Sequence, residues 1–231
     1  TYTSVFLALA IAAIVLILKY VKTEKTLSMI MRIIGGVLFI CILWNRISIC
    51  VSHKNALLLI PDTFCGISSL ILSLALLLGK RDNIVFHFIC YLGFIGGLIV
   101  VVYPDFIGQA SSIFYPDTIS GLLHHSIMFY TILIMTITKY FVPTIKKWYA
   151  LPLGLCCVMT LGIFEITVLD SNDAMQIFNP LLPDTFFTWW FCGILLLVFS
   201  YLVMVVFEYF NVWKKQSGSD NIKTETEEKT L

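Results

Sequence analysis

Charged residues are scarce in this sequence, and this scarcity limits the classes of protein to which the chain can belong. Asp, Glu, Lys and Arg make up only 13% of the 231 residues, whereas about 25% is usual in a soluble domain. The 15 basic and 14 acidic residues nearly cancel, so no basic face predicts nucleic-acid binding. Hydrophobic residues make up 59% of the chain, more than a compact soluble domain of this length could bury. The composition excludes an ordinary soluble enzyme and a disordered chain, and it predicts an integral membrane protein.

Motifs for metals and cofactors are also lacking. The seven cysteines form no CxxC pair and show no metal-ligand spacing, so we expect neither a metal nor a cofactor. The last apolar stretch contains no lysine that could form a Schiff base, which argues against a retinal protein. Five cysteines fall in or at the edge of apolar stretches, where cysteine packs as a small apolar residue: Cys41, Cys90, Cys156, Cys157 and Cys192.

Long apolar runs are the main feature of the sequence. A helix needs about 20 mostly apolar residues to cross the hydrocarbon core of a bilayer, and seven stretches approach or reach that length. They cover 4–20, 30–50, 57–79, 84–103, 118–140, 149–169 and 186–209. We therefore expect an all-α, polytopic membrane bundle of about seven helices in a single domain, 1–213, followed by a polar, disordered tail, 214–231.

The basic residues predict how this bundle is oriented, because Lys and Arg concentrate in cytoplasmic loops. Arg46 and Lys54 lie on one side of the predicted membrane. The other 13 basic residues lie on the opposite side: Lys19, Lys22, Lys25, Arg32, Lys80, Arg81, Lys139, Lys146, Lys147, Lys214, Lys215, Lys223 and Lys229. This split predicts an outside N-terminus, an inside C-terminus and a multi-pass protein of the cell membrane.

The tripeptide Pro-Asp-Thr occurs three times, beginning at Pro61, Pro116 and Pro183. Each copy precedes or opens a predicted span that runs inward. Proline suits the first turn of a helix, and Asp or Thr can cap its free N–H groups. The simplest interpretation is helix capping; the alternative is that several positive helix ends converge on one anion site. The first copy would place Cys65 in or just after the first turn, where the helix end favours a thiolate.

Ionisable residues inside spans are costly and mark candidate functional sites. Six stand out: Arg46, Asp62, His87, His124, His125 and Glu165. The predicted topology places His87 near the inner face and the other five, with Cys65, in the outer half. Arg46, Asp62 and Glu165 are candidate binding residues, although an ion pair of Arg46 with either acid could be purely structural.

Cys65 and the two adjacent histidines are the candidate catalytic residues. Asp62, Cys65 and Ser69 share one helix face, whereas His124 and His125 are about 100 degrees apart on theirs. A cysteine with an imidazole partner is a known nucleophilic unit, but the spacing does not decide which histidine would serve. Packing alone explains a cysteine of this kind equally simply.

Short motifs resemble a known family. Residues 59–65, LIPDTFC, resemble the LPLHLC segment of the YwaF-like bacterial integral membrane proteins, and residues 122–126, LLHHS, resemble their histidine segment. The resemblance extends over about 30–210 and matches His125 to the family's histidine. Asp62 and Thr63 replace Leu-His of the family segment, which removes a third histidine.

That family is similar to eukaryotic multi-pass relatives, namely a phospholipid acyltransferase with central Cys and His, and androgen-induced-type hydrolases of fatty esters. The resemblance implies that Cys65 is a nucleophile, that His125 is its base, and that membrane lipids are partners with a lipid or fatty ester as substrate. The residues themselves leave two further interpretations open: a small-solute binding or transport protein with a polar outer cavity, and a scaffold for other membrane proteins. They do not indicate an oligomeric state.

Overall fold

A computed structural model describes the backbone of residues 2–104, 112–182 and 184–228, and side chains within 4–210. Seven α-helices and two short 3-10 helices run through these residues, and no strand occurs among them. The helices are α1 (Tyr2–Tyr20), α2 (Glu24–His53), α3 (Phe64–Leu78), α4 (Phe86–Val102), α5 (Pro116–Ile137), α6 (Ala150–Val168) and α7 (Trp189–Glu228), with η1 (Ala56–Leu59) and η3 (Ile145–Lys147) between them.

Each of the seven helices overlaps one of the seven apolar stretches, so the predicted all-α bundle is confirmed. Four segments are long and apolar enough to cross a membrane, namely Glu24–His53, Pro116–Ile137, Ile145–Val168 and Trp189–Phe210. The helices α1, α3 and α4 are apolar but shorter. The seven-span count, the orientation, the single domain 1–213 and the disordered tail 214–231 stay predictions.

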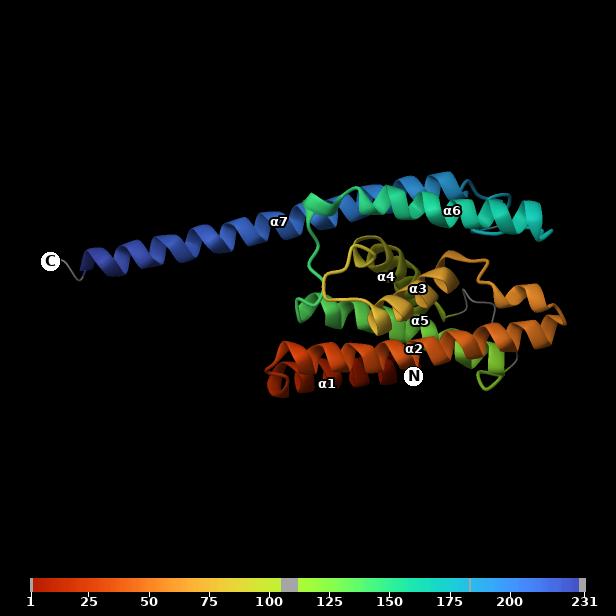
Figure 1. Ribbon diagram of the computed structural model, residues 1–231, viewed down its shortest axis with the longest axis horizontal. Helices are drawn as coiled ribbons and strands as arrows, with labels where there is room; N and C mark the ends of the chain where they lie inside the picture. Colours follow the sequence, from red (N-terminus) through yellow and green to blue (C-terminus); the bar gives the residue numbers. More distant parts are fainter. Residues whose placement is uncertain (1, 105–111, 183, 229–231) are drawn as a thin grey trace.

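The bundle has an inner group of helices and a peripheral pair. The helices α2, α3, α4 and α5 pack against one another, with α1 along α5. The helices α6 and α7 lie side by side on one face of this group (Figure 1). The connections α1–α2, α3–α4 and α5–α6, which carry five of the twelve lysines, meet at one end. We call this the lysine-rich end and the other the opposite end.

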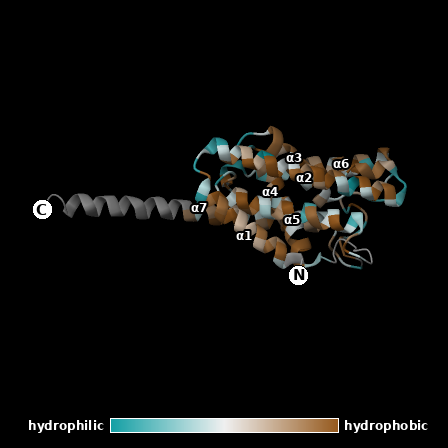
Figure 2. Cartoon of the chain, turned by 90° about the horizontal axis from the view of Figure 1, so that it is seen from below, coloured by the Kyte–Doolittle hydropathy of each residue, from teal (hydrophilic) through white to brown (hydrophobic). Residues whose placement is uncertain are grey.

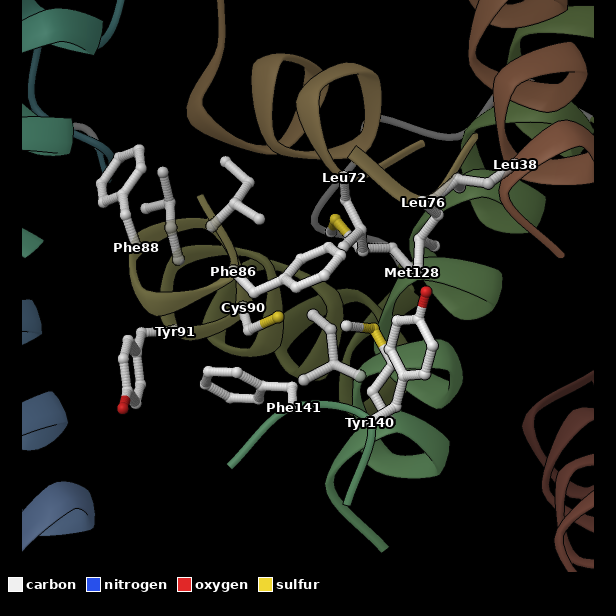
Figure 3. Packing of buried hydrophobic residues seen from close by; sticks show 14 of the residues in the cluster. Leu38, Leu72, Leu76, Phe86, Phe88, Cys90, Tyr91, Met128, Tyr140 and Phe141 are labelled. Carbon is white, nitrogen blue, oxygen red and sulfur yellow. The ribbon is translucent and has the colours of Figure 1, made fainter. Parts of the chain in front are cut away.

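The core lies between α3, α4 and α5 near the lysine-rich end. Leu76 of α3, Phe86 of α4 and Met128 of α5 are fully buried, and Tyr140 and Phe141 from the next loop close the cluster (Figure 3). Large apolar side chains also cover the outer surfaces of α1, α6 and α7, while polar residues gather in the connections (Figure 2). Apolar surface of that extent requires lipid around it, in agreement with a membrane protein.

A polar clamp joins two connections at the lysine-rich end. The His87 side chain is fully buried, and its Nε2 lies 2.9 Å from Asp82 Oδ1. Lys147 Nζ lies 3.1 Å from the same nitrogen and donates to the Asp82 carbonyl at 3.0 Å. Burial alone would raise the pKa of Asp82, but hydrogen bonds from Lys147 and His87 outweigh it, so the pKa is lowered. The carboxylate therefore ties the α3–α4 connection to η3.

The three Pro-Asp-Thr copies differ in what they do. The first ends in Thr63, whose side chain accepts from Gly66 N at 3.2 Å and caps α3. In the second, Pro116 is the first residue of α5 and Asp117 lies in its first turn. The prediction for the third copy is wrong, because α7 begins only at Trp189 and Thr185 Oγ1 instead donates to Leu182 O at 2.7 Å. Pro183 lies outside the described residues.

Candidate functional site

Cys65 is the second residue of α3, so its thiol lies in the first helical turn. The turn forms here because the Thr63 backbone is extended and its hydroxyl caps the helix. The N–H groups of a first turn have no partner within the helix and create a positive end. Cys65 therefore lies at the positive end of α3.

Two adjacent glycines of α4 bring the neighbouring helices close to this thiol. A Cβ placed at Gly96 would lie 2.6 Å from Cys65 Sγ. A Cβ at Gly97 would lie 2.8 Å from Phe129 Cβ and 3.0 Å from the backbone oxygen of His125. The lack of side chains thus lets α4 contact α3 at Cys65 and α5 at His125 in successive residues.

The two histidines of α5 are buried, and their rings are in contact in a tilted arrangement, with centroids 4.0 Å apart. His125 Nδ1 lies 2.7 Å from the carbonyl oxygen of Gly121, one turn earlier. A carbonyl only accepts, so His125 Nδ1 carries the proton and Nε2 of the neutral ring is left as an acceptor. His124 Nδ1 lies 2.9 Å from Ser69 Oγ of α3, which fixes the second ring between α5 and α3.

Arg46 and Asp62 form a largely buried ion pair. Arg46 Nη1 donates to Asp62 Oδ1 at 2.9 Å, with the Arg46 side chain 9% exposed and that of Asp62 30% exposed. Arg46 Nε is buried and has no hydrogen-bond partner among the described residues. Glu165 is also buried, and its Oε1 is likewise without a partner there.

Four of the six predicted site residues line one cavity of about 910 Å³: Arg46, Cys65, His124 and His125. Asp62 and Glu165 instead line a second cavity of about 350 Å³. The larger cavity continues between α4 and α7 along apolar side chains that include Phe94, Ile95, Leu98, Leu195, Leu196 and Phe199. The thiol, two imidazoles and one guanidinium thus face a space that is otherwise mostly apolar. Their chemical roles stay predictions.

Sequence reasoning missed two residues of this cavity. Asn45 is buried, lines the cavity and donates through Nδ2 to Ser120 Oγ at 3.1 Å. Its position beside Arg46 within a span was the available signal. The second is Gly96, and nothing in the sequence linked it to Cys65. Within the described residues, no group of three or more His, Cys, Asp or Glu is arranged to hold a metal ion.

In a comparison with protein families, the chain matches the TMEM164 family over residues 1–172. The chain belongs to the TMEM164 family. The match includes α1 to α6 and every predicted site residue. No curated protein and no solved structure matches the chain.

Membership in the TMEM164 family and the apolar helices make this chain a multi-pass membrane protein. The assignment to the cell membrane in particular stays a prediction. So do the resemblance to YwaF-like proteins and the relation to acyltransferases and ester hydrolases.

Proposed function

We propose that this chain is a membrane-embedded enzyme that transfers the acyl group of a lipid ester through a thioester on Cys65. The observation that carries the proposal is the shared cavity, in which Cys65 and His125 face a long apolar space. Such a space suits an acyl chain whose ester group reaches the polar residues.

In the first step, His125 Nε2 accepts the thiol proton and Cys65 Sγ attacks the ester carbonyl. The positive end of α3 and the guanidinium of Arg46, which line the same cavity, stabilise the developing oxyanion. The carbonyl–oxygen bond then breaks, and the leaving alkoxide takes the proton from the imidazolium. The products of this step are an acylated Cys65 and a free hydroxyl on the first lipid.

In the second step, the hydroxyl of an acceptor attacks the thioester while His125 again accepts the proton. The carbon–sulfur bond breaks, the acyl group leaves on the acceptor, and the thiolate regains its proton from His125. Water as the acceptor would give hydrolysis by the same route. His124, held by Ser69, packs against the His125 ring and acts as a positioning residue.

The test uses the purified full chain in lipid nanodiscs with a fluorescent phosphatidylcholine and an unlabelled lysolipid. We expect Cys65→Ala to abolish transfer of the fluorescent acyl group. The matched control is Cys157→Ala, because Cys157 is an exposed cysteine of α6 that lines neither cavity. Wild-type activity in Cys65→Ala would overturn the proposal. Retained binding of small solutes with no transfer in any protein would favour a binding or transport function.

A further inference from the structure

The apolar part of the larger cavity lies between α4 and α7. Six apolar side chains line it, three from each helix: Phe94, Ile95, Leu98, Leu195, Leu196 and Phe199. The Cys65 thiol adjoins this part, because a Cβ at Gly96, the residue after Ile95, would lie 2.6 Å from Cys65 Sγ. A hydrocarbon chain that lies along these six side chains leaves no polar group without a partner.

Three of the six side chains are exposed although they line the cavity. Leu98 is 37% exposed, Leu195 is 47% exposed and Phe199 is 39% exposed. Elsewhere the cavity wall is closed, since Asn45 and His125 also line it and are almost fully buried. The cavity therefore opens to the outside of the bundle along the three exposed side chains.

This opening faces lipid. The segment Trp189–Phe210 of α7 is long and apolar enough to cross a membrane, and neither 189–207 nor the whole of α4 contains Asp, Glu, Lys or Arg. Apolar surface of this length requires hydrocarbon around it. The same cavity also has a polar side at the opposite end, where the exposed residue His53 lines it.

Two aromatic rings lie across the opening. The rings of Phe94 and Phe199 are stacked, with centroids 6.3 Å apart and planes 11° apart. Phe94 also packs against Phe129 of α5, at a centroid distance of 5.2 Å, whereas Phe199 contacts no other ring among the described residues. Phe94 is thus held on two sides, and Phe199 is the ring that is free to turn outward into lipid.

We propose that the acyl chain of a bilayer lipid enters the larger cavity sideways between α4 and α7, and that it displaces the ring of Phe199 as it enters. This route rests on the proposed function in one respect, since it is how a lipid ester would reach Cys65. Entry through water would expose the whole chain, which the hydrophobic effect opposes. Sideways entry keeps the chain in hydrocarbon throughout and leaves the head group toward the polar side at His53.

The experiment compares how fast two maleimides modify Cys65 in the full chain in lipid nanodiscs. One maleimide carries a long alkyl chain and stays in the bilayer, and the other is small, charged and confined to water. Peptide mass mapping over time gives both rates. We expect Phe199→Ala to speed modification by the long-chain reagent about two- to tenfold, the worth of one aromatic pair. Its rate with the water-soluble reagent should stay unchanged.

Two controls separate the opening from general loosening of the bundle. Cys156 and Cys157 are exposed on α6 and line neither cavity, so their rates with the long-chain reagent should be equal in all proteins. The matched variant is Leu202→Ala, because Leu202 of α7 is exposed and lines neither cavity. We expect this variant to modify Cys65 at the wild-type rate.

Three results would overturn the proposal. The first is an unchanged long-chain rate in Phe199→Ala, and the second is an equal rise for both reagents. The third is a Cys65 that the long-chain reagent does not modify in any protein. The experiment involves no acyl transfer, so these results would leave the Cys65 thioester to its own test. Conversely, transfer activity in Cys65→Ala would overturn the thioester and leave the sideways opening standing.

Discussion

The tautomer of His125 is set by a single backbone contact. The carbonyl oxygen of Gly121 accepts a hydrogen bond from Nδ1 at 2.7 Å, so the ring offers Nε2 to whatever occupies the cavity. His124 differs because its Nδ1 contacts a hydroxyl, Ser69 Oγ, which can donate or accept. The sequence alone could not separate these two adjacent residues, since their difference depends on which atoms of other residues they meet.

Exchange of either histidine tests this assignment. General base catalysis contributes about 10²- to 10⁴-fold, so we expect His125→Gln to lower kcat of acyl transfer by about 100-fold or more. His124→Gln should cause a smaller loss, because that ring positions His125 without receiving the proton. Steady-state transfer of a fluorescent acyl chain measures both. A larger loss in His124→Gln than in His125→Gln would reverse the two roles.

The Asp82 carboxylate is the charged residue whose effect on stability should depend on pH. Its folded pKa is lowered, so its contribution is present above the unfolded value of about 3.9 and is lost as pH falls through the folded pKa. We expect Asp82→Asn to lower Tm at pH 7 and the difference from wild type to shrink below about pH 4.

Thermal unfolding followed by tryptophan fluorescence across this pH range gives the measurement. Glu24→Gln is the control, because Glu24 is 82% exposed in its ion pair with Arg81 and exposed pairs contribute little. A Tm difference for Asp82→Asn that stays constant from pH 7 to pH 3 would contradict the role assigned to its charge.

At the scale of helices, α4 contacts both α3 and α5 closely at the site because two of its residues have no side chain. Gly96 and Gly97 are the residues where α4 touches Cys65 and α5. Apolar periodicity locates such a helix from the sequence, but it does not tell which glycine faces which neighbour. The polar clamp of Asp82, His87 and Lys147 was not predicted either, because Lys147 is 60 residues from His87 in the sequence.

Gly96→Ala therefore tests the geometry of the site without changing its chemistry. The added Cβ would lie 2.6 Å from Cys65 Sγ, so the thiol must move, and a misplacement of about 1 Å can cost about 100-fold in rate. We expect kcat to fall by about 10- to 100-fold. Gly36→Ala is the matched control, because its Cβ would meet Leu77 Cδ2 at 3.8 Å, an ordinary contact. Equal activity in the two variants would show that this contact does not position Cys65.

At the scale of the whole molecule, the sequence was sufficient to predict the seven helices and their approximate positions along the chain. Apolar runs located seven helices because lipid imposes length and composition on each. The start of α7 was misplaced, because the apolar residues Phe186 and Phe187 precede the first helical turn. Cys65 and the two histidines line one cavity, whereas their depth in the membrane stays a prediction. The second cavity, at Glu165, depends on a loop fold that no pattern in the sequence indicates.

The central claim is that Cys65 carries an acyl group during turnover, and the most direct measurement is the intact mass of the protein. After incubation with a phosphatidylcholine and no acceptor, we expect one added acyl group on the wild-type chain, located at Cys65 by peptide mapping and removed by neutral hydroxylamine. Cys65→Ala should gain no mass. The His125→Gln protein should acylate more slowly. An unmodified wild-type chain that nevertheless transfers acyl groups, or an acyl group mapped to another residue, would contradict the account.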